Sequence, residues 1–162
     1  MSNESYKKIA KARRDFKTEH LELYLKSGGA KGHIVDVRDI RGHRFTTTLL
    51  LQTTGRKSQQ KRITPLIYGD IGGEIVVVAS KGGADHHPAW YLNIKSSKEL
   101  RFQVATQAFR ATWREPEPAE RAKIWDFMVG VFPPYKDYQA STDREIPLVM
   151  MAPQEAIECF SE

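Results

Sequence analysis

The spacing of apolar and polar residues changes twice along the chain. In the first segment Ile9, Phe16 and Leu23 recur at intervals of seven, which places them on one face of a helix. Gly28 follows as a stop signal, and the opposite face of the segment is strongly basic. We therefore expect a helix from about Ser5 to Lys26.

Between residues 34 and 114 the pattern consists of short runs rich in Val, Ile, Thr and aromatic residues, separated by turn residues. Such runs are typical of strands in a sheet or barrel. The segments Gly55–Ser58 and Asp70–Gly73 have the composition of hairpin turns. One short helix is expected after Pro88 and carries Trp90. The strands expected from these runs are His43–Thr53, Arg62–Tyr68, Glu74–Ser80, Leu100–Ala105 and Phe109–Arg114.

The final third returns to a helical pattern. A helix is expected to begin near Pro118, where acidic residues complement the helix dipole, and to run to about Val131. A Pro-Pro pair breaks it, a short turn or helix follows, and a last strand from Ile146 to Met151 is expected to end at Pro153. The predicted fold class is α+β, mainly β, with one barrel-like domain and helices at its start, middle and end.

The composition fits one soluble globular domain, because 40% of the 162 residues are hydrophobic and 28% are charged. A chain of roughly 150 residues buries enough surface for a core without disulfides or a structural metal. No apolar run approaches the roughly 20 residues that span a bilayer, and no signal-peptide core follows Met1. The single cysteine, Cys159, excludes a disulfide framework and a Cys-rich zinc site, so we expect a reducing, cytoplasmic location.

The net charge of +5 is spread unevenly. Residues 1–31 carry eight Lys or Arg and four Asp or Glu, residues 32–114 carry thirteen and six, and residues 115–162 carry four and ten. The acidic last third disfavours a long polyanion such as nucleic acid, and a compact anionic ligand fits better. The basic face of the first helix either contacts an anionic membrane surface or a ligand's tail, or is simply solvated. Its cations are Lys7, Lys8, Lys11, Arg13, Arg14 and Lys17.

Two turns combine cations with free backbone donors. The first runs from Thr53 to Ser58, where hydroxyls, N–H groups and two adjacent cations can bind a phosphate. Its spacing is not that of a P-loop, and an exposed basic hairpin is the simpler interpretation. The second, Ser80–Ala84, follows a strand, and its two glycines let the backbone approach a planar or phosphorylated ligand closely. The alternative interpretation of this second segment is a flexible turn.

Two further segments offer reactive side chains. His86 and His87 lack the spacing of a metal site, so we expect no metal, and Trp90 is either core or the wall of an aromatic cofactor's pocket. Tyr135 and Tyr138, in a segment stiffened by prolines, present both hydroxyls toward one space or pack over the barrel mouth. No Ser/His/Asp order or paired-carboxylate spacing is present, so a cofactor is the more natural source of chemistry.

The succession of these segments resembles the deazaflavin (F420)-dependent nitroreductase family, small actinobacterial oxidoreductases of the F420H2-dependent quinone reductase type. The matching motifs lie in order between about residues 45 and 153, and together they are far more specific than any one alone. The resemblance implies a split β-barrel in which the deazaflavin lies in a groove. The matching stretches are Leu49–Ser58, Arg62 with Thr64–Leu66, Ala79–Ala84, Pro88–Asn93, Tyr135–Gln139 and Thr142–Pro147.

The resemblance also implies roles for single residues. Arg56, Lys57 and Arg62 would hold the phosphate of F420, and Trp90 would close the pocket. Ser80 and the two tyrosines would support hydride transfer on the acceptor side. The cofactor-binding residues implied in this way are Thr54, Arg56, Lys57, Ser58, Arg62, Pro65, Tyr68, Ala79, Lys81, Gly82, Gly83 and Trp90, and the catalytic residues are Ser80, Tyr135 and Tyr138.

Three positions depart from the family's pattern. Phe132 stands where the best-known members carry a tyrosine, and Gln59 and Lys61 stand where glycine and proline are usual. The resemblance implies that the chain divides into a basic N-terminal helix, 1–31, and a deazaflavin-binding split barrel, 32–162, which together form a single domain.

The activity implied is hydride transfer from reduced F420 to a quinone, an activated alkene or a nitro-aromatic compound. A carrier of deazaflavin or lipid without turnover, and an FMN enzyme on the same barrel, are the alternatives. The partners expected are a small-molecule electron acceptor and an anionic membrane that is contacted peripherally through the N-terminal helix. Nucleic acid is not expected as a partner. The oligomeric state stays open.

Overall fold

The computed structural model describes residues 16–97 and 99–161. Its strands form one antiparallel sheet of eight strands in the order β1-β2-β6-β7-β8-β5-β4, with β3 paired to the other edge of β2. The strands are β1 (Ile34–Val35), β2 (Thr46–Thr54), β3 (Lys61–Ile67), β4 (Gly69–Ile71), β5 (Glu74–Val78), β6 (Leu100–Val104), β7 (Gln107–Arg114) and β8 (Leu148–Ile157). An N-terminal helix includes residues 16–26, and the other helices of the described residues are η1 (Arg38–Ile40), η2 (Lys81–Gly83), α2 (Ala89–Ser96), α3 (Pro118–Val131) and α4 (Pro134–Ala140). The expected α+β split barrel is confirmed.

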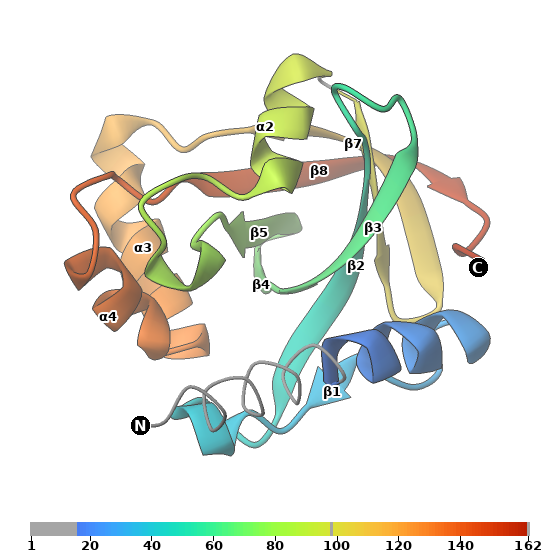
Figure 1. The fold of residues 1–162 in the computed structure, drawn as a ribbon, viewed down its shortest axis with the longest axis horizontal. Helices are drawn as coiled ribbons and strands as arrows, with labels where there is room; N and C mark the ends of the chain where they lie inside the picture. The colour runs from blue at the N-terminus through green and yellow to red at the C-terminus, as the bar shows by residue number, and fades with distance from the viewer. Residues whose placement is uncertain (1–15, 98, 162) are drawn as a thin grey trace, which may run out of the picture.

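The sheet curls around an inner apolar cluster beneath α2 (Figure 1). Leu49 and Leu51 of β2 belong to this cluster, whereas Leu50 between them packs in another cluster with Tyr24. Successive side chains of a strand point to opposite faces, so β2 is apolar on both faces because both are covered.

Helices α3 and α4 cover the outer face of β5 and β8 (Figure 1). Val77 points into the barrel, whereas its neighbours Val76 and Val78 pack beneath these two helices. Helix α3 has the bounds expected from the sequence, and Glu117 and Glu120 close its N-terminus as a capping box. The sheet therefore separates two apolar clusters, and the end of β5 lies between them.

The N-terminal helix does not bury the residues that the seven-residue spacing predicts. Residues 16–26 are helical, but the side chains of Phe16 and Leu23 are 56% and 46% exposed. Tyr24 is the fully buried residue of this helix, and Ile9 lies outside the described residues, as do the basic residues from Lys7 to Arg14. The helix thus docks through an aromatic residue that the pattern of sevens leaves out.

The last strand does not end at Pro153. β8 continues to Ile157, and its register against β7 shifts between Arg110 and Ala111, where Ala111 pairs with Pro153 and Arg110 with Glu155. A bulge of this kind accommodates a residue that lacks an N–H donor, because the ladder is interrupted there. The expectation of an end at Pro153 was wrong for this reason.

Candidate functional site

The β2–β3 connection is a closed turn. The Gly55 N–H donates to the Gln60 carbonyl over 2.8 Å, and the Gln59 N–H donates to the Gly55 carbonyl over 2.9 Å. Ser58 takes part through its hydroxyl oxygen, which accepts the Gln60 N–H over 3.2 Å. Gln59 has a φ of 58°, in the left-handed region where glycine is normally found. Gln59 stands where the family usually has glycine, and it therefore keeps the glycine-type backbone conformation of the turn while adding a long side chain.

The cations of this turn are presented to solvent. Arg56 is fixed to α2, because the buried Asn93 Oδ1 accepts its backbone N–H over 3.1 Å and its Nη1 over 3.0 Å. Across residues 16–97 and 99–161, no carboxylate forms an ion pair with any of the four exposed cations here, which are Arg56, Lys57, Lys61 and Arg62. Such a group of cations without acidic partners fits a phosphate.

A second backbone feature follows β5. Lys81, Gly82 and Gly83 have φ values of 46°, 63° and 84°, and the Gly83 N–H donates to the Ser80 carbonyl over 3.0 Å. Three successive left-handed residues make a sharp loop, and glycine adopts this conformation without the clash that a side chain brings. A Cβ on Gly83 would lie 2.3 Å from the Ser141 hydroxyl oxygen, so α4 packs directly against the loop.

This packing places the loop against α4, the helix that carries Tyr135 and Tyr138. The Ser141 hydroxyl donates to the Gly83 carbonyl over 3.1 Å, and a Cβ on Gly83 would also lie 2.9 Å from the backbone oxygen of Tyr138. The rings of Tyr135 and Tyr138 lie edge to face with centroids 6.3 Å apart. Burial raises the pKa of Tyr135, whereas Tyr138 is only half-buried. Phe132 is buried and packs edge to face on Tyr135, 5.0 Å between centroids.

The remaining expected cofactor residues lie on the inner side of the sheet. Trp90, Tyr68 and Ala79 belong to the inner cluster, whereas Tyr135 belongs to the cluster under α3 and α4. The Tyr68 hydroxyl and His33 Nε2 are 2.7 Å apart, and burial raises the pKa of Tyr68. The structure therefore groups the site residues in two sets, which meet at the Ser80–Gly83 loop.

Two more residues on the strands border these sets. Pro65 is half-buried on β3 and pairs with Leu50 of β2. Thr54, at the end of β2, is half-buried and lines a small cavity of about 90 Å³ together with Lys61. Both therefore lie on the strands that carry the basic turn.

Sequence reasoning missed the side chain that holds this loop. Arg144 donates from Nε to the Ala84 carbonyl (2.7 Å), from Nη1 to the Ala79 carbonyl (3.2 Å) and from Nη2 to the Ser80 carbonyl (2.8 Å). Its Nη1 also lies 3.0 Å from His87 Nδ1. The partners lie 57 to 65 residues earlier in the chain, so no local pattern could have shown them.

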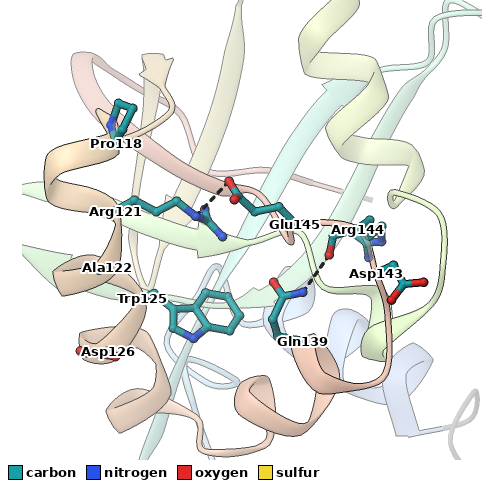
Figure 2. Close-up of a pocket in the computed structure, with 9 residues that line it drawn as sticks. All are labelled: Pro118, Arg121, Ala122, Trp125, Asp126, Gln139, Asp143, Arg144 and Glu145. Carbon is teal, nitrogen blue, oxygen red and sulfur yellow. Dashed lines mark hydrogen bonds and ion pairs between the residues drawn. The ribbon is translucent and has the colours of Figure 1, made fainter.

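A cavity of about 520 Å³ lies elsewhere (Figure 2). It opens between α3 and the segment that joins α4 to β8, and none of the expected cofactor or catalytic residues lines it. Because three carboxylates face two arginines in its wall, it matches an anionic cofactor less well than the basic turn, whose cations have no acidic partner in the described residues. Its lining residues are Pro118, Arg121, Ala122, Trp125, Asp126, Gln139, Asp143, Arg144 and Glu145.

Other side chains near the loop form local contacts. His86 Nε2 lies 2.7 Å from Lys81 Nζ, and His86 Nδ1 lies 3.0 Å from an Asp85 carboxylate oxygen. In the described part of the chain, no group of three or more His, Cys, Asp or Glu is placed to hold a metal ion. Among the helices described there, none is long and apolar enough to cross a membrane.

Comparison with known proteins points to one family. A family model described as F420H(2)-dependent quinone reductase matches residues 19–153. An F420H(2)-dependent quinone reductase of Mycobacterium tuberculosis is 35% identical over 116 residues, which cover 68% of this chain and 78% of the relative. A solved F420-H2 dependent reductase is 40% identical, with 64% of this chain and 92% of the other covered and a TM-score of 0.59. A solved domain-swapped dimer is 35% identical, with 86% and 98% covered and a TM-score of 0.62.

Proposed function

The chain belongs to the F420H(2)-dependent quinone reductase family, and from that membership we propose that it transfers a hydride from reduced F420 to a small electron acceptor. The observation that carries this proposal is the basic turn after β2. Its exposed cations lack acidic partners in the described residues, as an anionic cofactor requires.

The residues that would hold the cofactor come from three elements. Arg56, Lys57 and Arg62 would bind its phosphate, with Arg56 preorganised by Asn93. The Ser80–Gly83 loop would lie along the ring system, because its left-handed backbone leaves room for close approach. When bound, the reduced deazaflavin supplies a hydride from its C5 carbon.

The acceptor side is assigned to Ser80, Tyr135 and Tyr138. The backbone of Tyr138 lies against the loop and its side chain is half-buried, which supports the assignment of its hydroxyl to an acceptor bound beside the loop. Burial raises the pKa of Tyr135, which keeps the phenol protonated at neutral pH and able to donate a hydrogen bond. These hydroxyls would orient the acceptor and stabilise the negative charge that it gains.

The acceptor proposed first is a quinone, and activated alkenes and nitro-aromatic compounds extend the same class of electron-poor molecules. The test is steady-state oxidation of F420H2 with a panel of these acceptors, with FMN reduced in place of F420 as the matched control. The proposal predicts turnover with F420H2 and a quinone. F420 binding without turnover would favour a carrier, and turnover only with reduced FMN would favour an FMN enzyme.

The cellular location proposed is the cytoplasm, with contact at the membrane surface through the N-terminal helix. Exposed Phe16 and Leu23 lie on this helix, and residues 1–31 carry eight Lys or Arg against four Asp or Glu, a combination that favours an anionic lipid surface. Sedimentation with phosphatidylglycerol vesicles tests this contact, with phosphatidylcholine vesicles as the control. Serine at both Phe16 and Leu23 should abolish vesicle binding, whereas Phe45→Ser, an exposed site off the helix, should not.

A further inference from the structure

Arg144 is almost fully engaged by backbone carbonyls. Four of its contacts lie between 2.7 and 3.2 Å, and three of them are carbonyls that flank or belong to the Ser80–Gly83 loop. A guanidinium has five N–H donors in one plane and no acceptor, so little of its hydrogen-bonding capacity is left for a ligand. The guanidinium therefore holds the loop and has little capacity to bind a ligand directly.

Because peptide bonds are planar, the contacts of Arg144 with the loop carbonyls also fix the direction of the neighbouring N–H groups. In a trans peptide the N–H points opposite to the preceding C=O. Because the Ala79 and Ser80 carbonyls point at Arg144, the N–H groups of Ser80 and Lys81 point away from it, to the other side of the loop. Within residues 16–97 and 99–161, neither N–H donates to a protein acceptor. The two donors are adjacent and available.

Arg144 is itself held in place from two sides. The side-chain amide of Gln139 on α4 donates to the Arg144 carbonyl over 2.7 Å (Figure 2). The same side chain accepts the Ile146 N–H over 2.9 Å. On the other side, His87 Nδ1 faces Nη1, and burial, followed by the charges of Arg144 and Lys95, lowers the pKa of His87. A neutral His87 presents a lone pair to the guanidinium, so this contact is a hydrogen bond.

We propose that Arg144 is a positioning residue that aims the N–H groups of Ser80 and Lys81 at an oxygen of the bound deazaflavin ring. The inference rests on the proposed function, since it names a ligand for these donors. Lysine cannot replace arginine here, because a single ammonium cannot reach three carbonyls in a fixed planar arrangement. The same α4 helix carries Gln139 and both acceptor-side tyrosines, so the donors and the tyrosines are fixed to one element.

The test compares Arg144→Lys with Arg121→Lys. Arg121 is the matched control, because its guanidinium bonds the Ile146 carbonyl over 2.7 Å and pairs with Glu145 but does not contact the loop. F420 affinity is measured by fluorescence titration. Loss of two aligned hydrogen bonds predicts binding about 10-fold weaker in Arg144→Lys. Arg121→Lys should stay within about 2-fold of wild type.

A second readout does not depend on turnover. Amide hydrogen exchange of Ser80 and Lys81 should slow when F420 binds to the wild-type protein, and this protection should be lost in Arg144→Lys. In Arg144→Ala, added guanidinium ion should restore F420 affinity, whereas added methylammonium should not. If the variants fail to fold, a lack of protection of Ser80 and Lys81 in the wild-type protein with F420 bound still overturns the proposal.

The outcomes separate this inference from the proposed function. Unchanged F420 affinity in Arg144→Lys, or no protection of Ser80 and Lys81 in wild type that binds F420, would overturn the role of Arg144 alone. A wild-type protein that binds no F420 would instead overturn the proposed function, and with it the ligand assigned to these donors.

Discussion

At Gln59 a long polar side chain occupies a backbone conformation that suits glycine. Its φ of 58° lies in the left-handed region, which costs a non-glycine residue about 1–2 kcal/mol. Its side-chain amide recovers part of this cost, because Nε2 donates to the Arg56 carbonyl over 3.3 Å. The strain lies next to the cations that are proposed to bind phosphate.

Gln59→Gly is therefore expected to stabilise the protein. The change removes the left-handed strain but also raises the entropy of the unfolded chain, so the net gain in unfolding free energy is about 0.5–1 kcal/mol. Urea denaturation measures it. Gln60→Gly is the control, because Gln60 has no positive φ, and it should lower the unfolding free energy. A loss of stability in Gln59→Gly would show that the side-chain amide outweighs the strain.

The β2–β3 hairpin is the element on which cofactor affinity is expected to depend. Arg56→Ala and Lys57→Ala each remove a charge-assisted contact worth roughly 1.5–3 kcal/mol, so F420 should bind about 10- to 100-fold more weakly in each variant. The double variant should be weaker still, and added salt should weaken wild-type binding. Fluorescence titration at low and high ionic strength gives these values. A double variant that binds as wild type does at low salt would contradict the phosphate assignment.

Helix α4 is the element proposed to act on the acceptor. Tyr135→Phe and Tyr138→Phe keep the aromatic rings and remove only the hydroxyls, so F420 affinity should persist. kcat/KM for a quinone should fall by about 10²- to 10⁴-fold if one hydroxyl is the general acid, and by less if it only orients the acceptor. Phe132→Tyr, measured with a quinone and a nitro-aromatic compound, shows whether a hydroxyl there widens the acceptor range. Wild-type rates in both Phe variants would remove these tyrosines from the mechanism.

Elements with local signals could be predicted from the sequence, and contacts between distant segments could not. The bounds of helix α3 could be predicted, because a proline and two acidic residues that complement the helix dipole mark its start. β8 was predicted too short, because the bulge that accommodates Pro153 depends on pairing with β7. Arg144 lay in a motif quoted for the family, yet its role depends on carbonyls more than fifty residues away. The roles of Ser80, Tyr135 and Tyr138 stay predictions.

On the scale of the whole molecule, the N-terminal helix is joined to the barrel by Tyr24. Its hydroxyl accepts the Ala105 N–H over 2.8 Å and donates to the Thr48 carbonyl over 3.1 Å. Burial raises the pKa of Tyr24 to about 12. The proposed division at residue 31 therefore marks a change along the sequence, and the helix still shares a buried cluster with Leu50 and Phe160.

Tyr24→Phe should lower the unfolding free energy by about 1–3 kcal/mol, because the half-buried Ala105 N–H loses its acceptor. Urea denaturation of the full chain measures the change. Leu23→Ala is the matched control on the same helix, since Leu23 is 46% exposed, and it should shift stability by no more than about 0.5 kcal/mol. Equal effects of the two substitutions would contradict the role assigned to Tyr24.

Single-turnover hydride transfer tests the central claim most directly. The wild-type protein is mixed under anaerobic conditions with F420H2 carrying deuterium at C5 and with a quinone, and the return of oxidised F420 is followed by its visible absorbance. We predict that the protein accelerates this oxidation and that deuterium slows it relative to the unlabelled coenzyme. An oxidation rate no faster than that of the protein-free mixture would contradict the claim.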